Sequence, residues 1–554
     1  MAKNIKARVM GENITIEQGT TFEELSKIYA DRYEAPIMLA QSGNILYELA
    51  DSVKDGMEIE FLELTNPDGI KVYGRSISFL MIKAVKDLFG MDTPVVIEHS
   101  INSNYYCEIR KAEIKINDDC LNKIKTRMRE IVLENIPIEK VTMSRDESIE
   151  MSLKFGMDDK ARLFRYRRAS NVNMYNMNGF YDYFYGYMVP STGYLDKFDI
   201  VAYERGFLIL FPDVKNLDKL EEYQRFDKIS KVFMEQMEWC KLMDVENVAD
   251  LNDLIVNGGF GELVLINEAL HEKKIAHIAD IITERKGKIK LVVIAGPSSS
   301  GKTTFAQRLC VQLRVNGIIP HTISLDDYFI EREKTPLDED GKPDFENINA
   351  LDLDLFNKNL NGLVKGERVE IPSYNFVLGK REYKGRYLQL QKDEIIVIEG
   401  IHGLNDQLTK AIESKNKFRI FISAMTQLNI DDHNRISTSD SRLIRRIVRD
   451  HQFRGNDAAT TIDSWASVKR GEENNIFPYQ ENADVMFNSA TIYELSVLKA
   501  YIEPLLFKID RSMPQYIMAK RIIKFLDYFL PVNSGCIPNN SIIKEFVGGS
   551  VFRV

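Results

Sequence analysis

The stretch Lys290-Leu-Val-Val-Ile-Ala-Gly-Pro-Ser-Ser-Ser-Gly-Lys-Thr303 decides the fold of the C-terminal half of this chain. An apolar strand runs into G-x-x-x-x-G-K-T, and residues 304–315 have the pattern of a helix. In this arrangement the backbone N–H groups of the loop and the positive end of the helix surround phosphate groups. The alternative is a Gly/Ser turn that only joins a strand to a helix, but the motif stands in the context that phosphate loops require. The stretch therefore predicts nucleoside triphosphate binding.

The residues of this loop have predicted roles. Lys302 is expected to reach the β and γ phosphates, and Thr303 to offer its hydroxyl to Mg²⁺. We assign nucleotide binding to the run Gly296, Ser298, Ser299, Ser300, Gly301, Lys302, Thr303 and Thr304. The predicted cofactors are therefore ATP and Mg²⁺.

Length and composition are those of a globular protein with several domains. The chain has 554 residues, of which 44% are hydrophobic and 28% are charged. A domain size of about 100 to 200 residues predicts roughly three to four domains. The net charge of -9 argues against a general affinity for nucleic acid or anionic membranes, so any RNA contact would be local.

The chain start and the cysteines indicate a cytoplasmic protein. Residues 1–8 lack the apolar core of a signal peptide, and no uncharged apolar run approaches the roughly 20 residues of a membrane span. The five cysteines are odd in number and include no C-x-x-C pair, which argues against a disulfide framework or a zinc ribbon. We expect reduced, buried thiols.

Two acidic residues follow apolar segments downstream of the loop. Residues 322–325 lead to Asp326, and residues 394–398 lead to Glu399. Two further apolar segments lie at 418–423 and 484–487. Helical segments between them predict a parallel sheet, at whose carboxyl edge the loop and both acids would meet. Phosphoryl transfer to an alcohol needs one carboxylate that deprotonates the hydroxyl and another beside Mg²⁺, the roles predicted for Asp326 and Glu399. The alternative is that each carboxylate caps the next helix.

A basic segment follows near the end of this region. Four arginines have the i, i+3, i+4 and i+7 spacing of one helix face. They are Arg442, Arg445, Arg446 and Arg449. Arg454 comes next, before a glycine that predicts a hinge. Arginines on a mobile segment can neutralise the charge on a transferred phosphoryl group and exclude water from it. The alternative is a solvated basic face paired with Asp440 and Asp450.

Residues 288–506 resemble the uridine kinase and phosphoribulokinase family. The segments that carry the resemblance stand in the family's order: G-P-S-S-S-G-K-T, S-L-D-D-Y-F, I-P-S-Y-N-F, I-V-I-E-G and D-S-R-L-I-R-R-I-V-R-D. The resemblance implies transfer of the γ-phosphoryl group of ATP to the 5′-hydroxyl of a nucleoside. By the resemblance the catalytic residues are Asp326 (the base), Lys302, Arg449 and Arg454, and the magnesium neighbours are Thr303 and Glu399.

The same resemblance assigns a substrate site. It implies ribose contacts from Glu346 and Arg446 and aromatic contacts beside the base from Tyr374 and Phe376, and we add Arg381 to this site. The sequence departs from the family at this site. Asn347-Ile348 replaces His-Pro, and Gly379 and Ser464 stand where a histidine and a glutamine are expected. Loss of these hydrogen-bonding side chains weakens the assignment of uridine as the substrate.

The first 65 residues predict a small β-grasp unit. Strands are expected near 5–10, 13–17, 37–40, 45–48 and 57–64. Thr21 and Glu24 have the spacing of a capping box at the start of a helix. This segment resembles the TGS domain of threonyl-tRNA synthetases.

The resemblance to threonyl-tRNA synthetases continues into their editing-type domain. Where that family has H-x-x-x-H, this chain has Phe79 and Lys83, and where it has C-x-x-x-H, this chain has Phe184 and Met188. His99 is the only histidine between residues 1 and 270, so a His/Cys metal cluster cannot form there. We expect a binding or scaffold unit rather than a hydrolase.

An aromatic and basic stretch lies in the same region. Aromatic side chains recur between residues 180 and 194, and arginines occur at 162, 165, 167 and 168. Such groups can stack on unpaired bases, which would make the N-terminal half an RNA contact. The alternative is a strand that packs aromatic rings on one face beside a solvated row of arginines.

The predicted fold class is multi-domain, α+β and α/β. The ranges are 1–65 (TGS-like β-grasp), 66–215 (editing-like α+β without metal ligands), 216–285 (helical connector), 286–507 (P-loop kinase with a parallel sheet) and 508–554 (C-terminal helices and tail). The tail alternates apolar and polar residues, which predicts docking against another domain or, in a homo-oligomer, a second subunit. The favoured function is a Mg-ATP-dependent nucleoside kinase. The alternatives are a phosphoribulokinase-type small-molecule kinase and an ATP-binding, RNA-associated regulatory protein.

Overall fold

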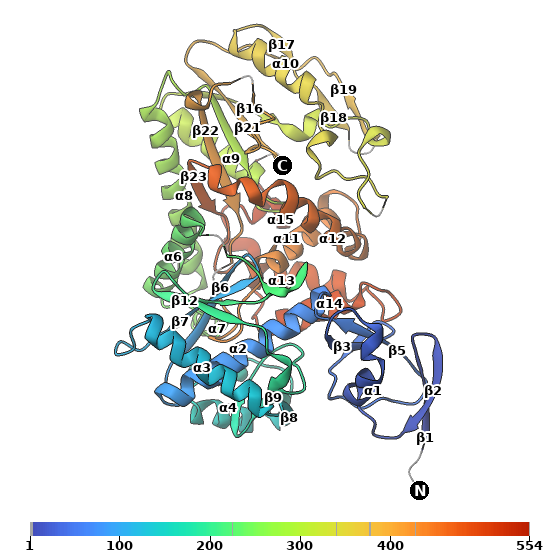
Figure 1. Ribbon diagram of the computed structural model, residues 1–554. Coiled ribbons are helices and arrows are strands. Elements are labelled where there is room, and N and C mark those ends of the chain that lie inside the picture. Colours follow the sequence, from blue (N-terminus) through green and yellow to red (C-terminus); the bar gives the residue numbers. More distant parts are fainter. Residues whose placement is uncertain are drawn as a thin grey trace.

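The apolar segments of the C-terminal half form one parallel sheet (Figure 1). The computed structural model describes residues 4–223, 225–339, 341–375, 378–410, 412–426 and 428–552. The strands lie in the order β16-β21-β15-β22-β23, and every pairing between them is parallel. They are β15 (Leu291–Ala295), β16 (Ile319–Ser324), β21 (Glu394–Glu399), β22 (Lys417–Ser423) and β23 (Val485–Asn488). The predicted parallel sheet is confirmed.

Helices cover both faces of this sheet. Along β15, Val292 and Ile294 pack into the cluster that contains α9, α11 and α13, whereas Leu291 and Val293 pack into the cluster that contains α10. The helices are α9 (Lys302–Val315), α10 (Leu353–Val364), α11 (Thr438–Phe453), α12 (Ala458–Asn475) and α13 (Glu494–Leu506). Two short hairpins pair β17 (Val369–Glu370) with β20 (Tyr387–Leu388) and β18 (Ser373–Asn375) with β19 (Lys380–Glu382). Burial on both faces explains the unbroken apolar run of β15.

The N-terminal residues form the expected β-grasp arrangement. The sheet order is β2-β1-β5-β3-β4, with β1 and β5 parallel. The elements are β1 (Asn4–Val9), β2 (Glu12–Glu17), α1 (Phe22–Tyr29), β3 (Ile37–Ser42), β4 (Ile45–Tyr47) and β5 (Met57–Glu63). Thr21 and Glu24 exchange the two hydrogen bonds of a capping box at the start of α1, as their spacing predicts.

The next part packs two sheets around a long helix, α2 (Pro67–Phe89). One sheet has the order β10-β9-β8 and the other β11-β12-β7-β6. The further elements are β6 (Val95–Ile101), β7 (Asn104–Ile109), α3 (Asp118–Glu134), β8 (Glu139–Ser144), α4 (Arg145–Lys154), α5 (Asp158–Arg165), β9 (Asn171–Met177), β10 (Phe180–Asp182), β11 (Asp199–Tyr203) and β12 (Gly206–Leu210). The rings of Phe79 and Phe184 lie 5.4 Å apart in the core, and Lys83 pairs with Asp87.

The predicted connector differs from the expectation at its start. Residues 216–220 were expected to be helical, but β14 (Asn216–Leu220) pairs with β13 (Pro212–Asp213) as a hairpin. Three helices follow: α6 (Asp227–Leu242), α7 (Val248–Val256) and α8 (Phe260–Glu284). Arg308 of α9 binds Glu272 (2.7 Å) and Glu268 (3.3 Å) of α8. The last of these helices is therefore packed on the helix of the phosphate loop.

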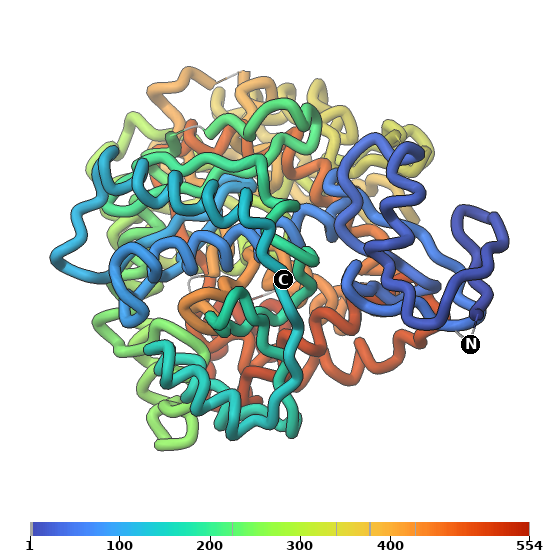
Figure 2. Tube along the Cα trace, turned by 60° about the horizontal axis from the view of Figure 1, so that its bottom comes forward, coloured from blue at the N-terminus to red at the C-terminus, as the bar shows by residue number. Residues whose placement is uncertain are grey.

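The C-terminal helices connect distant parts of the chain. Figures 1 and 2 place α14 (Tyr516–Leu526) beside the β-grasp strands, and Asn44 donates a hydrogen bond to the carbonyl of Arg511 (3.1 Å). A short helix, α15 (Lys544–Val547), then returns to α11. Thus α14 packs on the N-terminal sheet, and the tail packs on α11 beside the parallel sheet.

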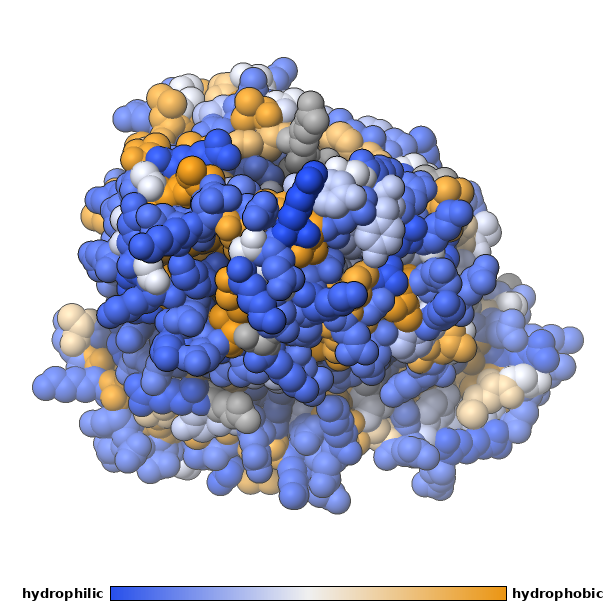
Figure 3. All heavy atoms as spheres, turned by 90° about the horizontal axis from the view of Figure 1, so that it is seen from above, coloured by the Kyte–Doolittle hydropathy of each residue, from blue (hydrophilic) through white to orange (hydrophobic). Residues whose placement is uncertain are grey.

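The face opposite the N-terminal unit is mostly hydrophilic, with apolar side chains in small separate groups (Figure 3). Within the part of the chain that the structure describes, we find no helix that combines the length and apolarity needed to cross a membrane.

Candidate active site

The phosphate loop is held in shape from its outer side. Arg442 donates to the carbonyl of Ser298 (3.1 Å), Arg445 to that of Ser299 (3.4 Å), and the hydroxyl of Ser489 to that of Ser300 (2.6 Å). These bonds satisfy loop carbonyls that would otherwise be unpaired. The curved loop is therefore fixed before a nucleotide binds.

Lys302 lies folded over this loop. Its Nζ donates to the carbonyl oxygens of Gly296 (3.0 Å) and Pro297 (3.1 Å). Burial lowers the pKa of Lys302, and the nearby carboxylates of Glu399 and Asp326 oppose this shift. The structure thus brings the lysine and both predicted acids together.

The two acids reach the loop from neighbouring strands. Asp326 lies in a short 3₁₀ helix after β16, and Glu399 is the last residue of β21. Ser324 is paired with Glu399 in the sheet and donates its hydroxyl to the Glu399 Oε1 (2.8 Å). Burial, and next the negative charge of Asp326, raise the pKa of Glu399 to about 7. Their meeting at the carboxyl edge is the geometry that the strand order predicts.

Glu346 is a third carboxylate at this site. Burial, and next the charge of Glu472, raise the pKa of Glu346 to about 7. The Cβ of Glu346 lies directly over Gly471, where an added Cβ would be only 2.2 Å away. Its Oε2 is buried and has no hydrogen-bond partner among the described residues. A buried oxygen of this kind can accept a hydrogen bond from a substrate hydroxyl.

The arginine segment divides into two groups. Arg442 and Arg445 are buried and bind Glu472 (2.6 Å) and Glu494 (3.1 Å), so they form neither a solvated face nor a lid. The second group gathers around Asp450: Arg446 (3.3 Å), Arg449 (3.1 Å) and Arg454 (3.7 Å). The charge of Asp326 acts on Arg454, which places this arginine near the proposed base. Asp440 pairs with Arg521 instead (2.8 Å).

Two of the predicted substrate residues, Tyr374 and Arg381, lie on the hairpin of β18 and β19, which contacts the segment 325–328 that carries Asp326. The backbone N–H of Tyr374 donates to Asp327 (3.3 Å), and its ring packs on Phe329 at 5.6 Å. Arg381, its pairing neighbour in the hairpin, forms an ion pair with Asp352 (2.8 Å). Phe376 lies outside the described residues. Sequence reasoning missed Phe329, whose ring links Tyr374 to the segment that carries Asp326.

The two atypical positions have structural explanations. Gly379 has φ +65°, and an added Cβ would lie 2.9 Å from the Cβ of Arg332, so a histidine does not fit there. The hydroxyl of Ser464 donates to the carbonyl of Thr461 (3.0 Å) within its own helix. Neither position supplies a free side chain to read a base.

Sequence reasoning did not assign any residue of the C-terminal tail to this site. Glu545 Oε2 accepts hydrogen bonds from the Thr304 backbone N–H (3.2 Å) and hydroxyl (2.7 Å). Ile542 lies against Gly301, and Ile542, Ile543 and Phe546 are fully buried. The expected docking therefore occurs within the chain. Because Thr304 belongs to the predicted nucleotide site, Glu545 uses donors that a phosphate would use.

The residues present fit ATP and Mg²⁺. Ser299 Oγ and Ser300 Oγ are buried without a hydrogen-bond partner among the described residues, although they lie in the phosphate loop. Thr303, Asp326 and Glu399 supply oxygen atoms, which are the ligands that Mg²⁺ prefers. Among the described residues no group of three or more His, Cys, Asp or Glu side chains is arranged to hold a metal. Mg²⁺ at kinase sites takes one or two carboxylates and completes its shell with phosphates and water.

Comparison with known proteins agrees with the two resemblances. Residues 291–496 match the model of the phosphoribulokinase / uridine kinase family. A uridine kinase from Ligilactobacillus salivarius is 29% identical over 206 residues, which is 37% of this chain and 87% of that protein. A threonine–tRNA ligase from Syntrophotalea carbinolica is 30% identical over 206 residues, which is 34% of this chain. The chain spans between 25% and 38% of the length of the threonine–tRNA ligases compared. A solved possible uridine kinase from Bacillus stearothermophilus is 19% identical with a TM-score of 0.27, covering 39% of this chain and 98% of that one.

Proposed function

We propose that this chain, whose C-terminal region is a P-loop kinase of the phosphoribulokinase and uridine kinase family, phosphorylates the 5′-hydroxyl of a nucleoside with ATP. The observation that carries the proposal is the meeting of Lys302, Asp326 and Glu399 at one edge of the sheet, near Arg454. This edge combines phosphate binding with a carboxylate that is suited to accept a proton. The cytoplasmic location stays a prediction from the sequence.

In this mechanism Asp326 accepts the proton of the acceptor hydroxyl as its oxygen attacks the γ phosphorus. Lys302 and the loop N–H groups hold the β and γ phosphates in line with that oxygen. Arg449 and Arg454 stabilise the negative charge on the phosphoryl group during transfer. Thr303 and Glu399 would hold Mg²⁺, which neutralises charge on the phosphates when bound.

The acceptor side favours a nucleoside over a sugar phosphate. Glu346 places a carboxylate there, and Tyr374 and Phe329 place aromatic rings there. A carboxylate accepts hydrogen bonds from ribose hydroxyls but repels a phosphate group. Aromatic rings can stack on a base. The phosphoribulokinase-type alternative would need a phosphate site among these residues.

The test is a panel of nucleosides and sugar phosphates incubated with Mg-ATP, with the products identified by mass. We expect phosphate on the 5′-hydroxyl of at least one nucleoside. Phosphorylation of sugar phosphates alone would support the alternative, and no product from a broad panel would remove the kinase proposal.

The raised pKa of Glu399 predicts a pH-dependent affinity for Mg²⁺. Below about pH 7 this carboxyl is protonated and neutral, and above it the carboxylate is charged and can hold the cation. We expect the affinity for an ATP analogue with Mg²⁺ to fall by up to about tenfold per pH unit below pH 7. Titrations between about pH 5.5 and 8.5 measure this. The phosphates of ATP titrate in the same way in the Glu399→Gln variant, which has no carboxyl group at this position. If the affinity of that variant falls with the same slope, the pH dependence does not come from Glu399.

The contact of Glu545 with Thr304 predicts competition with ATP. Replacing Glu545 with alanine should free both donors at the start of α9 and lower the Kd for an ATP analogue by about three- to tenfold. Calorimetric titration of the full chain measures this Kd. Glu413→Ala, at an exposed site with the same charge change, is the control. An unchanged or weaker affinity in Glu545→Ala would show that the tail does not compete.

A further inference from the structure

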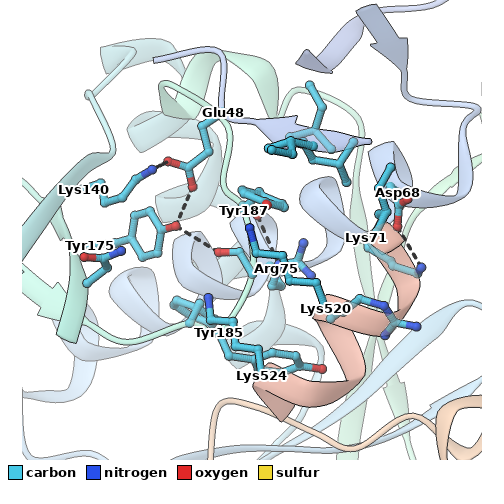
Figure 4. A pocket seen from close by; sticks show the side chains of 18 of the residues that line it. Glu48, Asp68, Lys71, Arg75, Lys140, Tyr175, Tyr185, Tyr187, Lys520 and Lys524 are labelled. Atoms are coloured by element: carbon cyan, nitrogen blue, oxygen red, sulfur yellow. Dashed lines mark hydrogen bonds and ion pairs between the residues drawn. The ribbon is translucent and has the colours of Figure 1, made fainter. Parts of the chain in front are cut away.

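A second cavity, separate from the kinase site, lies where three parts of the chain meet (Figure 4). Its volume is about 130 Å³, and its walls come from residues 44–48 of the β-grasp unit, from α2, from residues 183–187 and from α14. Of the described residues, none that we assign to the kinase site lines this cavity. The cavity thus needs its own explanation.

The cavity is strongly cationic. Seven arginine or lysine side chains line it, against the two carboxylates Glu48 and Asp68. The whole chain has a net charge of -9, so this concentration of positive charge does not follow from composition. Positive charges gathered in a concave site raise the local concentration of anions.

Four of these cations are not neutralised by a carboxylate of the described residues. In the described part of the chain, Arg75, Arg167, Lys520 and Lys524 form no ion pair with a carboxylate, whereas Lys71 and Arg521 do. Partial burial, and next the positive charges of Arg167 and Arg75, lower the pKa of Lys524 to about 8. The cations therefore repel one another, and a bound anion would relieve this repulsion.

Arg75 and Glu48 are held in place in this cavity. The Nε of Arg75 donates to the carbonyl of Tyr187 (3.1 Å), and its guanidinium lies against Gly186, where an added Cβ would be 2.2 Å away. Any larger residue than glycine would displace the guanidinium. Glu48 is bound by Lys140 (2.6 Å) and by the backbone N–H of Met188 (3.0 Å), so its charge is neutralised inside the wall. Figure 4 shows Lys520 and Lys524 of α14 next to Arg75.

Aromatic rings complete the site. Tyr185 and Tyr187 are half-buried and line the same cavity as the free cations. An engineered cavity of about 150 Å³ holds one benzene ring, so the space here takes one ring, and the rest of a ligand would lie at the mouth, where Lys520 and Lys524 are exposed. Part of the aromatic and basic stretch singled out in the sequence therefore lines a concave site, namely Arg167, Tyr183, Phe184, Tyr185 and Tyr187.

We propose that this cavity binds a small phosphate ester of the nucleoside monophosphate class, with the phosphate among Arg75, Lys520 and Lys524 and the ring against Tyr185 or Tyr187. Lysines and arginines are the usual partners of phosphate oxygens, and tyrosine rings stack on bases. The site is independent of the proposed kinase function, because it shares no residue with the kinase site.

The test is calorimetric titration of the full chain with AMP. AMP can also enter the kinase site, so the readout is the part of the binding that depends on the cavity lysines. We expect AMP to bind this protein, and the pair Lys520→Ala and Lys524→Ala to weaken binding by about tenfold or more. The control pair Lys54→Ala and Lys231→Ala removes two exposed lysines outside the cavity and should leave the affinity unchanged.

Parallel titrations identify the group that is bound. If ribose 5-phosphate and inorganic phosphate bind more weakly than AMP, the result supports a nucleotide as the ligand. Inorganic phosphate that binds as tightly as AMP, and is lost in the Lys520→Ala and Lys524→Ala protein, would support the phosphate site with free phosphate as its ligand. The proposal is overturned if neither binds, if the cavity variant binds as the control does, or if only an RNA oligonucleotide binds.

Discussion

Replacing Asp326 with asparagine is expected to lower kcat for nucleoside phosphorylation by about 10²- to 10⁴-fold, the range for loss of a positioned base. Asparagine keeps the shape of the side chain but cannot accept the hydroxyl proton. The affinity for ATP should change little, because the loop and the outer arginines that hold it are untouched. Steady-state kinetics and calorimetric ATP titration measure the two effects.

The neighbouring Asp327 provides a matched control. Its carboxylate accepts a hydrogen bond from the Tyr374 N–H (3.3 Å) and pairs with Arg386 (3.4 Å), so it supports the hairpin. Asp327→Asn should therefore alter KM more than kcat. Unchanged turnover in Asp326→Asn, or an equal loss of kcat in Asp327→Asn, would assign the base elsewhere.

The parts of the site that follow from local sequence were predictable. The order strand, loop and helix around Gly296–Thr303 predicts where the loop lies, and apolar runs that lead to Asp326 and Glu399 predict two acids at the same edge. These features depend on hydrophobic periodicity and turn chemistry within a few residues. The capping box of Thr21 and Glu24 is equally local.

The contacts that could not be predicted join residues far apart in the chain. Glu545 lies 241 residues from Thr304, and Glu472 binds Arg442 across 30 residues. No short motif encodes either contact, because each depends on how complete helices pack. The spacing of the four arginines correctly predicts one helix, but it cannot say that α12 and α13 bury two of them.

This division of the arginines predicts a large effect on stability. Arg445 is fully buried and binds Glu494, which is 1% exposed. Arg445→Met would leave that carboxylate charged, buried and without its main partner. We expect the free energy of unfolding of the kinase region to fall by about 3 to 5 kcal/mol. Urea denaturation followed by the fluorescence of Trp465, in a Trp239→Phe background, measures this change.

The double variant separates the ion pair from the packing around it. Arg445→Met with Glu494→Met removes both charges, so it should recover a large part of the lost stability. Its ATP affinity should stay weakened, because the bond from Arg445 to the Ser299 carbonyl is also gone.

Arg449→Met, in contrast, should lower kcat and leave stability nearly unchanged, since this arginine only shares Asp450 with two others. If Arg445→Met and the double variant are equally stable, Arg445 and Glu494 are not energetically coupled. If Arg449→Met is less stable than Arg445→Met, the two groups of arginines have the reverse roles.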